Sequence, residues 1–213
     1  MIRPRVLLAD DHKIVAQGLS SLLEPEYELV GIAEDGRELV SAFRKLRPDV
    51  VVTDISMPSL NGLEAARQIK TIDDRARIIF LTMHLDAEFA TAAFQLGASG
   101  YLLKLSAAEE LKTALSEVLK GRVYVTPRIA GTVLTSLAEH GAETEDPWDG
   151  LTPRQREVLQ LVAEGESNKR IASILGVSIK TVEHHKHNIR QKLRLETTAD
   201  LTRYAIKRGL ISI

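Results

Sequence analysis

The sequence contains no cysteine and no apolar run long enough to cross a membrane. Without cysteine the chain has neither disulfides nor thiolate metal ligands, which fits a reducing compartment. The first apolar stretch, Val6–Ala9, is too short to be the core of a signal peptide. These absences predict a soluble protein of the cytoplasm.

Charge is distributed unevenly along the 213 residues. Of the 28 basic and 29 acidic residues, 12 and 7 lie from Trp148 onward, a balance of +5, which leaves 16 and 22 before it, a balance of −6. This asymmetry indicates that the first part binds a cation or phosphate and that the second part binds a polyanion. The alternative is that the difference is ordinary surface charge. With 44% hydrophobic residues, the chain is long enough for two packed domains, although length alone also allows one large domain.

Short apolar runs alternate with segments of helical periodicity over residues 1–121. The runs predict five buried parallel strands, at Val6–Ala9, Leu29–Ala33, Val50–Thr53, Ile78–Thr82 and Tyr101–Leu103. The periodic segments predict five helices, at Ile14–Leu23, Arg37–Leu46, Gly62–Lys70, Glu88–Leu96 and Ala107–Lys120. This alternation predicts an α/β domain with a doubly wound, flavodoxin-like, five-stranded parallel sheet. Its ligand crevice is expected at the carboxyl ends of the strands.

The pattern changes after residue 121. Residues 122–147 are interpreted as a linker with an apolar-faced helix at Thr126–Leu137, and the stretch from His140 to Gly150 is acidic and broken by Gly and Pro. Residues 148–213 predict an all-α domain of four helices, at Pro153–Glu164, Asn168–Leu175, Ile179–Leu193 and Thr198–Lys207.

Five polar residues fall at successive ends of the predicted strands. In strand order they are Asp10 and Asp11, then Asp54, Thr82 and Lys104. Clustered carboxylates repel one another unless a cation lies between them, and such hard oxygen ligands suit Mg²⁺. Lys104 and Thr82 supply the charge and the hydroxyl that hold the oxygens of a phosphoryl group on a carboxylate, so Asp54 is the expected nucleophile. A single Asp after a strand is more often a turn former or, like Asp11, a candidate helix cap, but the joint pattern favours chemistry.

These residues and their neighbours resemble the receiver domain of two-component response regulators. The matching segments are Asp10-Asp11, Asp54-Ile-Ser-Met57-Pro58 with Asn61-Gly62, Thr82, and Gly97-Ala-Ser-Gly-Tyr101-Leu-Leu-Lys104. The resemblance implies that Asp54 accepts phosphate from a sensor histidine kinase or a small donor such as acetyl phosphate. It also implies that Asp11, Asp54 and the backbone carbonyl of Ser56 hold Mg²⁺, with Asp10 contributing through water.

The resemblance assigns further roles around the crevice. Thr82 and Tyr101 would form a switch pair in which the threonine hydroxyl moves to the phosphoryl group and the tyrosine ring follows it inward. Taken alone, Tyr101 would more often be a half-buried aromatic residue of a strand. Gly62 would shape the loop after Asp54 by tolerating positive φ. Many receivers have Pro after the lysine, where this chain has Leu105; the phosphate-binding role of the lysine is unaffected. His12 is assigned no role, because no second histidine stands at ligand spacing.

The second domain carries the signals of a helix-turn-helix. Thr152 is a predicted N-cap, the second helix ends at Gly176, and Ser178 caps the third helix. That helix, Ile179–Leu193, has apolar residues at helical spacing and a polar opposite face, as a helix that enters the major groove does. The alternative is a helical hairpin whose basic face is merely solvated.

Three segments of this domain resemble the LuxR-type domain of NarL/FixJ-family regulators. They are Leu151-Thr-Pro-Arg-Gln-Arg-Glu-Val-Leu159, Glu166-Ser-Asn-Lys-Arg-Ile-Ala172 and Thr181-Val-Glu-His-His-Lys-His-Asn-Ile189. The resemblance places Glu183, His184 and His187 toward the groove. It places four residues nearer the phosphates, namely Lys180, Thr181, Lys186 and Arg190. Several members carry Lys where Glu183 stands, so the operator sequence is not readable. The last helix would form a dimer contact or simply pack within the bundle.

Together these features predict a response regulator in which phosphorylation of Asp54 controls sequence-specific binding to double-stranded promoter DNA. The expected partners are Mg²⁺, a sensor histidine kinase and, when phosphorylated or DNA-bound, a second copy of the chain. An enzyme such as a phosphatase would need a second carboxylate two residues after the nucleophile, where Ser56 stands. We therefore expect no enzymatic activity beyond autophosphorylation and autodephosphorylation. A DNA-binding protein that needs no phosphorylation is disfavoured by the intact crevice.

Overall fold

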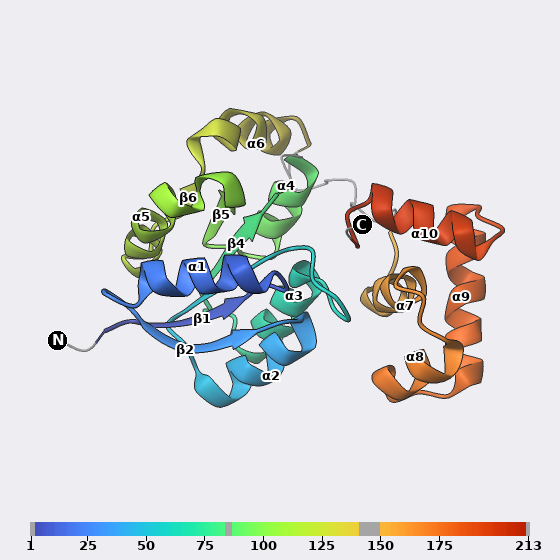
Figure 1. Ribbon diagram of the computed structural model, residues 1–213. Helices are drawn as coiled ribbons and strands as arrows, with labels where there is room; N and C mark the ends of the chain where they lie inside the picture. Colours follow the sequence, from blue (N-terminus) through green and yellow to red (C-terminus); the bar gives the residue numbers. More distant parts are fainter. Residues whose placement is uncertain (1–2, 84–86, 141–149, 212–213) are drawn as a thin grey trace.

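The computed structural model describes residues 3–83, 87–140 and 150–211, which form an N-terminal α/β domain and a C-terminal helical domain (Figure 1). The sheet is parallel, in the order β2 (Glu28–Ala33), β1 (Arg5–Ala9), β3 (Val50–Thr53), β4 (Ile78–Thr82), β5 (Gly100–Leu103) and β6 (Tyr124–Val125). The doubly wound fold is confirmed. The predicted count of five strands is wrong, because the two residues of β6 are too few to give a periodic signal.

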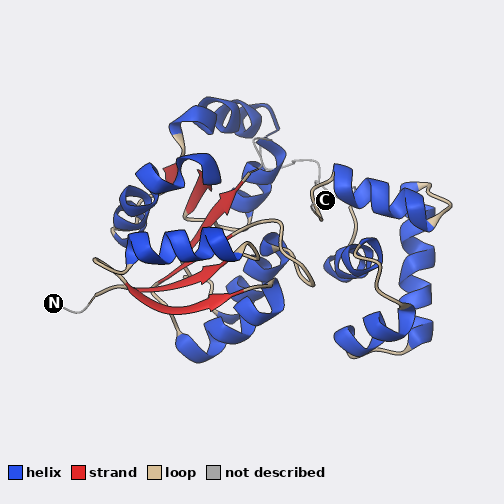
Figure 2. Ribbon diagram, in the orientation of Figure 1, coloured by secondary structure: helices blue, strands red, loops and turns tan. Residues whose placement is uncertain are grey.

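Helices cover both faces of the sheet (Figure 2). One face packs against α1 (Lys13–Leu23) and α5 (Ala107–Leu119), and the other against α2 (Gly36–Leu46), α3 (Gly62–Ile72) and α4 (Ala87–Gln95). Successive side chains of a strand point to opposite faces, so Leu8 joins the first layer and Leu7 the second. Both are buried, which explains the continuous apolar runs of the central strands.

The strand order determines where the ligand crevice lies. β1 lies between β2 and β3, so the chain reverses its direction of winding at β1, and the carboxyl ends of β1 and β3 open side by side. Ala9 at the end of β1 pairs with Thr53 at the end of β3. Asp10 and Asp54, the next residues, therefore lie next to each other.

Residues after α5 extend the N-terminal domain. β6 pairs with β5, and the hydroxyl of Thr126 accepts a hydrogen bond from the backbone N–H of Leu103 at 3.2 Å. α6 (Pro127–His140) then packs against α4 through the buried side chains of Ile129 and Val133. Most of the acidic stretch expected to form the linker, residues 141–149, lies outside the described residues.

The C-terminal domain consists of α7 (Pro153–Ala163), α8 (Asn168–Leu175), α9 (Ile179–Leu193) and α10 (Thr198–Lys207). The predicted caps are confirmed: Thr152 forms a capping box with Gln155, Gly176 ends α8 at φ 64°, and the Ser178 hydroxyl accepts from the N–H of Thr181. α10 packs on α7 around the buried side chains of Leu201 and Ala205. Within the described residues, no helix is both long and apolar enough to cross a membrane.

Candidate functional site

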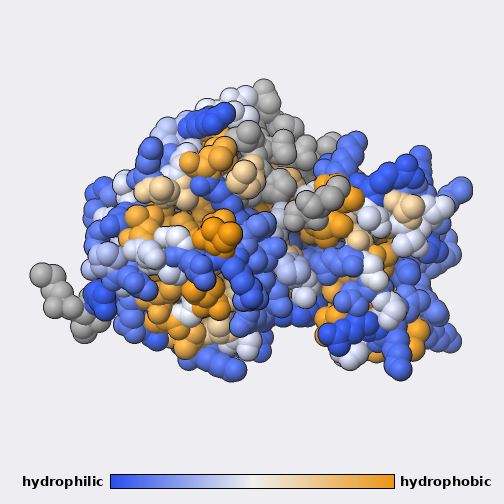
Figure 3. Space-filling model, viewed as in Figure 1, coloured by the Kyte–Doolittle hydropathy of each residue, from blue (hydrophilic) through white to orange (hydrophobic). Residues whose placement is uncertain are grey.

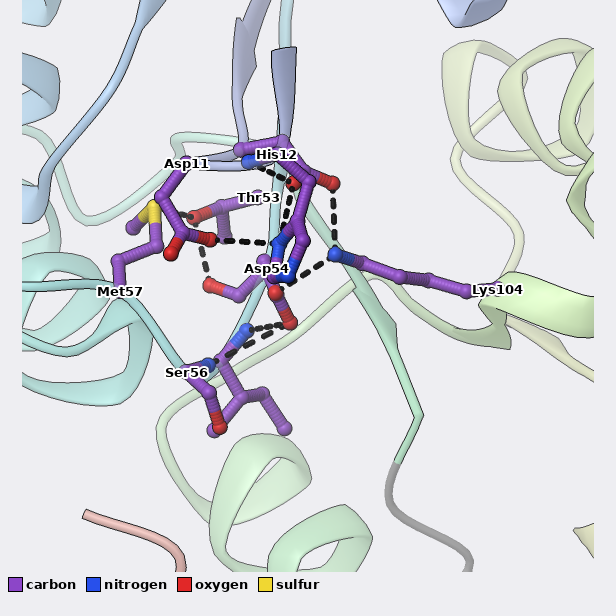
Figure 4. A network of polar contacts seen from close by, with 9 residues as sticks. Asp11, His12, Thr53, Asp54, Ser56, Met57 and Lys104 are labelled. Carbon is purple, nitrogen blue, oxygen red and sulfur yellow. Dashed lines mark hydrogen bonds and ion pairs between the residues drawn. The ribbon is translucent and has the colours of Figure 1, made fainter. Parts of the chain in front are cut away.

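An acidic cluster lies at the carboxyl ends of β1 and β3 (Figure 4). The carboxylates of Asp10, Asp11 and Asp54 and the imidazole of His12 offer ligand atoms that all lie within 4.8 Å of one another. Asp10 is 1% exposed and Asp54 is 4% exposed, whereas Asp11 is partly open to solvent. The structure thus brings together the three carboxylates that the sequence predicted as one group.

Lys104 bridges two of these carboxylates. Its Nζ lies 2.7 Å from Asp10 Oδ2 and 2.7 Å from Asp54 Oδ2, with the side chain largely buried. Burial lowers the pKa of Lys104, but the neighbouring carboxylates of Asp54 and Asp10 outweigh it, so the pKa is raised above its ordinary value. Lys104 is therefore a fixed ammonium that points at the candidate nucleophile from the end of β5.

Asp54 is oriented by its own loop. Its Oδ1 accepts hydrogen bonds from the backbone N–H groups of Ile55, at 2.6 Å, and Ser56, at 3.4 Å. Burial raises the pKa of Asp54 and the nearby charge of Asp10 adds to this effect, while Lys104 opposes it. The result is a desolvated carboxylate with one oxygen held by backbone and the other against an ammonium.

The donor set fits a hard divalent cation. Asp10 Oδ2 lies 2.7 Å from the ammonium of Lys104, and Asp11 Oδ1 lies 2.9 Å from Nδ1 of the His12 imidazole; both oxygens are buried, and neither has a further hydrogen-bond partner among the described residues. Carboxylate oxygens with unused lone pairs at a crevice open to water match the preference of Mg²⁺ for oxygen ligands and retained waters. The loop that carries Ser56 lies beside them (Figure 4).

His12 is a member of this cluster that sequence reasoning missed. Its Nδ1 lies 2.9 Å from Asp11 Oδ1 and 3.4 Å from Asp10 Oδ1, and its backbone N–H donates to Asp10 Oδ1. His12 also occupies the N-cap position of α1, so the alternative that Asp11 caps this helix is wrong. The position directly after the acidic pair was the available signal.

Thr82 and Tyr101 lie on the neighbouring strands β4 and β5, and both are fully buried. Thr82 pairs with Leu103, the residue before Lys104, which places the threonine at the same edge of the sheet as the ammonium. Tyr101 pairs with Phe80 inside the sheet, so the interpretation of Tyr101 as a half-buried aromatic is wrong.

Gly62 is required for a different reason than predicted. Its φ is not positive; the positive φ in this loop belongs to Ser59, at 64°. A Cβ on Gly62 would lie 1.9 Å from the carbonyl oxygen of Asp54. Gly62 therefore allows α3 to begin directly against the backbone of the candidate nucleophile.

The helix-turn-helix is formed by α8, the turn at Gly176 and α9. Along α9 the side chains of Lys180, Glu183, His184 and His187 are exposed, and those of Thr181, Lys186 and Arg190 are partly exposed. Lys186 Nζ donates to Asn168 Oδ1 of α8 at 3.0 Å, which ties the two helices together. α9 lies on the side of the C-terminal domain away from the sheet, where hydrophilic side chains predominate along the outer edge (Figures 1 and 3). All seven residues predicted to face DNA thus lie on one accessible helix.

Comparisons with known proteins identify the family of each domain. The response regulator receiver domain model matches residues 6–116, and the model of bacterial regulatory proteins of the luxR family matches residues 149–205. The chain belongs to the two-component response regulators that carry a LuxR-type DNA-binding domain. As a member of this family it is a transcription regulator, and the resemblance found in its sequence is confirmed.

Relatives of this response regulator share its whole length. The transcriptional regulatory protein LiaR of Bacillus subtilis (strain 168) is 39% identical over 98% of this chain and 99% of LiaR. A structure of the response regulator RcsB of Salmonella typhimurium is 31% identical, with a TM-score of 0.66 over 98% of this chain and 99% of that one. RcsB of Salmonella enterica serovar Typhimurium bound to promoter rprA with the phosphomimetic BeF₃⁻ is 32% identical, with a TM-score of 0.62 over 95% and 98% of the two chains.

The two domains of the response regulator meet through α7. Arg156 is 3% exposed, and its Nε lies 2.6 Å from Glu64 Oε1 on α3 of the receiver, which is 1% exposed. Gln160, one turn further along α7, is fully buried against the loop that follows Asp54. The sequence predicted α7 as a helix but not its contact with the receiver, because polar residues on one face of a helix normally indicate exposure to solvent.

Proposed function

We propose that Asp54 is the phosphoacceptor of this response regulator, and that phosphorylation of Asp54 controls binding of its LuxR-type domain to promoter DNA. The observation that carries the proposal is the position of Lys104, whose Nζ is 2.7 Å from both Asp54 and Asp10. A buried lysine held at this point neutralises charge on a phosphoryl group attached to Asp54.

The chemistry follows from the crevice residues. An Asp54 carboxylate oxygen attacks the phosphorus of a kinase phosphohistidine or of acetyl phosphate, the bond from phosphorus to the donor breaks, and the donor leaves with the electron pair. Lys104 then pairs with one phosphoryl oxygen and the Thr82 hydroxyl donates to another. Bound Mg²⁺ would supply further neutralisation of these oxygens, held by Asp11, Asp54 and the Ser56 carbonyl, with Asp10 acting through water.

Phosphorylation changes the receiver through the same residues. The added phosphoryl group brings negative charge and acceptor oxygens, toward which we expect the Thr82 hydroxyl to turn. Tyr101 is already inside the sheet, and we propose that its packing responds to Thr82 as the second member of a switch pair. Apart from its own phosphorylation and dephosphorylation, we propose no catalytic activity.

The LuxR-type domain supplies the DNA contacts. We propose that Glu183, His184 and His187 face the base edges. The residues proposed for the phosphates are Lys180, Thr181, Lys186 and Arg190. A single helix-turn-helix reads only one half-site, so we propose that the protein acts as a homodimer on DNA through α10. The structure of RcsB bound to promoter DNA supports DNA binding by this domain, and a structure of two RcsB dimers bound to two parallel DNAs supports the homodimer.

The proposed function implies a division of the chain into domains and a cellular location. We assign residues 1–121 to the receiver core, 122–147 to a linker whose first part, β6 and α6, packs on the receiver, and 148–213 to the DNA-binding domain. A cytoplasmic location fits the absence of cysteine and a partner that is chromosomal DNA.

Mass spectrometry after incubation with acetyl phosphate and Mg²⁺ tests the phosphoacceptor. We expect a labile adduct of one phosphoryl group on the wild type and none on Asp54→Ala. The matched control is Asp74→Ala, which removes an exposed carboxylate far from the crevice and should leave the adduct unchanged. An adduct of equal yield on Asp54→Ala would refute the assignment.

A further inference from the structure

His12 presents its imidazole to the two acidic residues that precede it (Figure 4). Its Nδ1 lies 2.9 Å from Asp11 Oδ1 and 3.4 Å from Asp10 Oδ1. Together with one oxygen of Asp54, these atoms form a group whose members all lie within 4.8 Å of one another. An octahedral ion with bonds of about 2.1 Å separates adjacent ligand atoms by about 3.0 Å and opposite ones by about 4.2 Å. The imidazole nitrogen and the carboxylates therefore already have nearly the spacing of ligands that share one ion.

The side chain of His12 does not serve the helix that it begins. His12 is the N-cap residue of α1, a position where Ser, Thr, Asp or Asn normally caps the first turn, yet its side chain forms no capping hydrogen bond. Residue 12 is instead held by its backbone N–H, which donates to Asp10 Oδ1 at 2.9 Å. Among the described residues, the carboxylates of Asp10 and Asp11 are the only polar partners of the imidazole. The imidazole is thus committed to the acidic cluster rather than to the fold of α1.

The two oxygens of Asp10 serve different partners. Its Oδ2 lies 2.7 Å from the ammonium of Lys104, which also contacts Asp54 Oδ2, whereas its Oδ1 faces His12. The side chains of Asp11 and His12 are 27% and 59% exposed, so a hydrated ion can reach them from solvent. An ion held by Asp10 Oδ1, Asp11 and His12 therefore uses oxygens that the ammonium does not occupy.

A nitrogen ligand changes which divalent ion a site prefers. Carboxylates and backbone carbonyls are the hard oxygen ligands of Mg²⁺, which keeps several waters and gains little from nitrogen. Neutral imidazole is a ligand of divalent transition ions, and the affinity of a mixed nitrogen and oxygen site for these ions rises along the series that begins with Mn²⁺. Exchange of one water for an imidazole nitrogen therefore stabilises a bound transition ion more than it stabilises bound Mg²⁺.

We propose that His12 Nδ1 is a ligand of the ion in the crevice, and that this nitrogen makes the site favour divalent transition ions such as Mn²⁺ over Mg²⁺. This inference rests on the proposed cation site of Asp11 and Asp54. In this role Nδ1 presents its lone pair to the ion, and Nε2 carries the proton of the neutral ring. Mg²⁺ still binds through the oxygens, so His12 changes the ratio of the two affinities rather than the existence of the site.

The EPR signal of free Mn²⁺ measures how much of this ion the full chain binds, and its displacement by Mg²⁺ gives the ratio of the two affinities. We expect His12→Asn, which puts a favoured N-cap residue in place of the nitrogen ligand, to lower the preference for Mn²⁺ over Mg²⁺ by about ten-fold. The matched control Lys13→Ala removes an exposed charge that pairs with Glu34 at 3.3 Å, so it should change both affinities alike and leave their ratio as it is. An unchanged ratio in His12→Asn would overturn the inference.

Pulsed EPR of the bound Mn²⁺ separates a ligand from a residue that only orients Asp11 by a hydrogen bond. The wild type should show the echo modulation of a directly bound imidazole nitrogen, and His12→Asn should lack it. A wild type without this modulation, or a His12→Asn protein that keeps it, would refute ligation by His12 even if the affinity ratio fell. Asp11→Asn should lose the bound Mn²⁺; if it binds as the wild type does, or if the wild type binds neither ion, the proposed cation site itself fails, which distinguishes the two failures.

Discussion

The carboxylates of the crevice are arranged for a ligand rather than for stability. Asp54 is desolvated, and Asp10, only 1% exposed, shares the single ammonium of Lys104 with it. Two buried carboxylates that share one lysine leave a net negative charge. A bound cation neutralises this charge, whereas without a cation the charge is a cost to the folded state. The sequence predicted these three residues because strand ends converge, but the partnership of His12 with Asp11 depends on the first turn of α1, which no spacing rule describes.

The titration of Asp54 gives a prediction at this scale. Burial raises its pKa above the ordinary value of 3.8, so the folded chain binds the proton more tightly than the unfolded chain does. Between the ordinary and the raised pKa the folded state holds more protons, and the free energy of unfolding must therefore fall as the pH rises. In Mg²⁺-free urea titrations, the wild type should lose stability relative to Asp54→Asn over this window. A stability difference that does not change with pH would contradict the burial of this carboxylate.

The elements of the fold follow from periodicity wherever they are long enough. β3 and α9 have the predicted bounds, because four consecutive β-branched residues and fifteen residues of helical spacing are unambiguous patterns. β6 was missed because it exists only through pairing with the edge of β5. The role of α7 was missed because its polar face is buried by another domain, and a sequence pattern does not distinguish burial in protein from exposure to water.

The junction between β3 and α3 gives a prediction at the scale of elements. Gly62→Ala places a methyl group against the Asp54 carbonyl oxygen, and backbone atoms on both sides must shift. We expect the free energy of unfolding to fall by about 3 kcal/mol, the cost of overpacking a tight interior. Gly18→Ala in α1, where nothing lies within 4 Å, is the matched control and should raise it by about 0.5–1 kcal/mol. Equal urea midpoints for the two variants would contradict the close approach.

At the scale of the whole molecule, charge separates the two functions. The basic surplus lies in the domain that carries α9, and the acidic surplus lies in the domain that carries the crevice. The asymmetry was visible in the sequence, whereas the polar contact that joins the domains was not, since Glu64 and Arg156 stand 92 positions apart. Long-range pairs of this kind are fixed by domain docking and leave no local pattern.

The dependence of DNA binding on salt tests the role of this charge. Each phosphate contact by a basic residue releases counterions, so Lys180→Ala should reduce the slope of log affinity against log salt by about 1 for each bound domain. Lys45→Ala removes an exposed charge from the receiver and should not change the slope. Identical slopes for all three proteins would place the DNA elsewhere on the molecule.

The affinity of the full chain for its promoter DNA, measured by fluorescence anisotropy with and without acetyl phosphate and Mg²⁺, tests most directly whether Asp54 controls DNA binding. Asp54→Ala is measured in parallel, and mass spectrometry of each sample gives the fraction phosphorylated. We expect the phosphorylated wild type to bind about ten-fold more tightly and Asp54→Ala to show no response. Equal affinities of phosphorylated and unphosphorylated wild type would contradict the claim that Asp54 controls DNA binding.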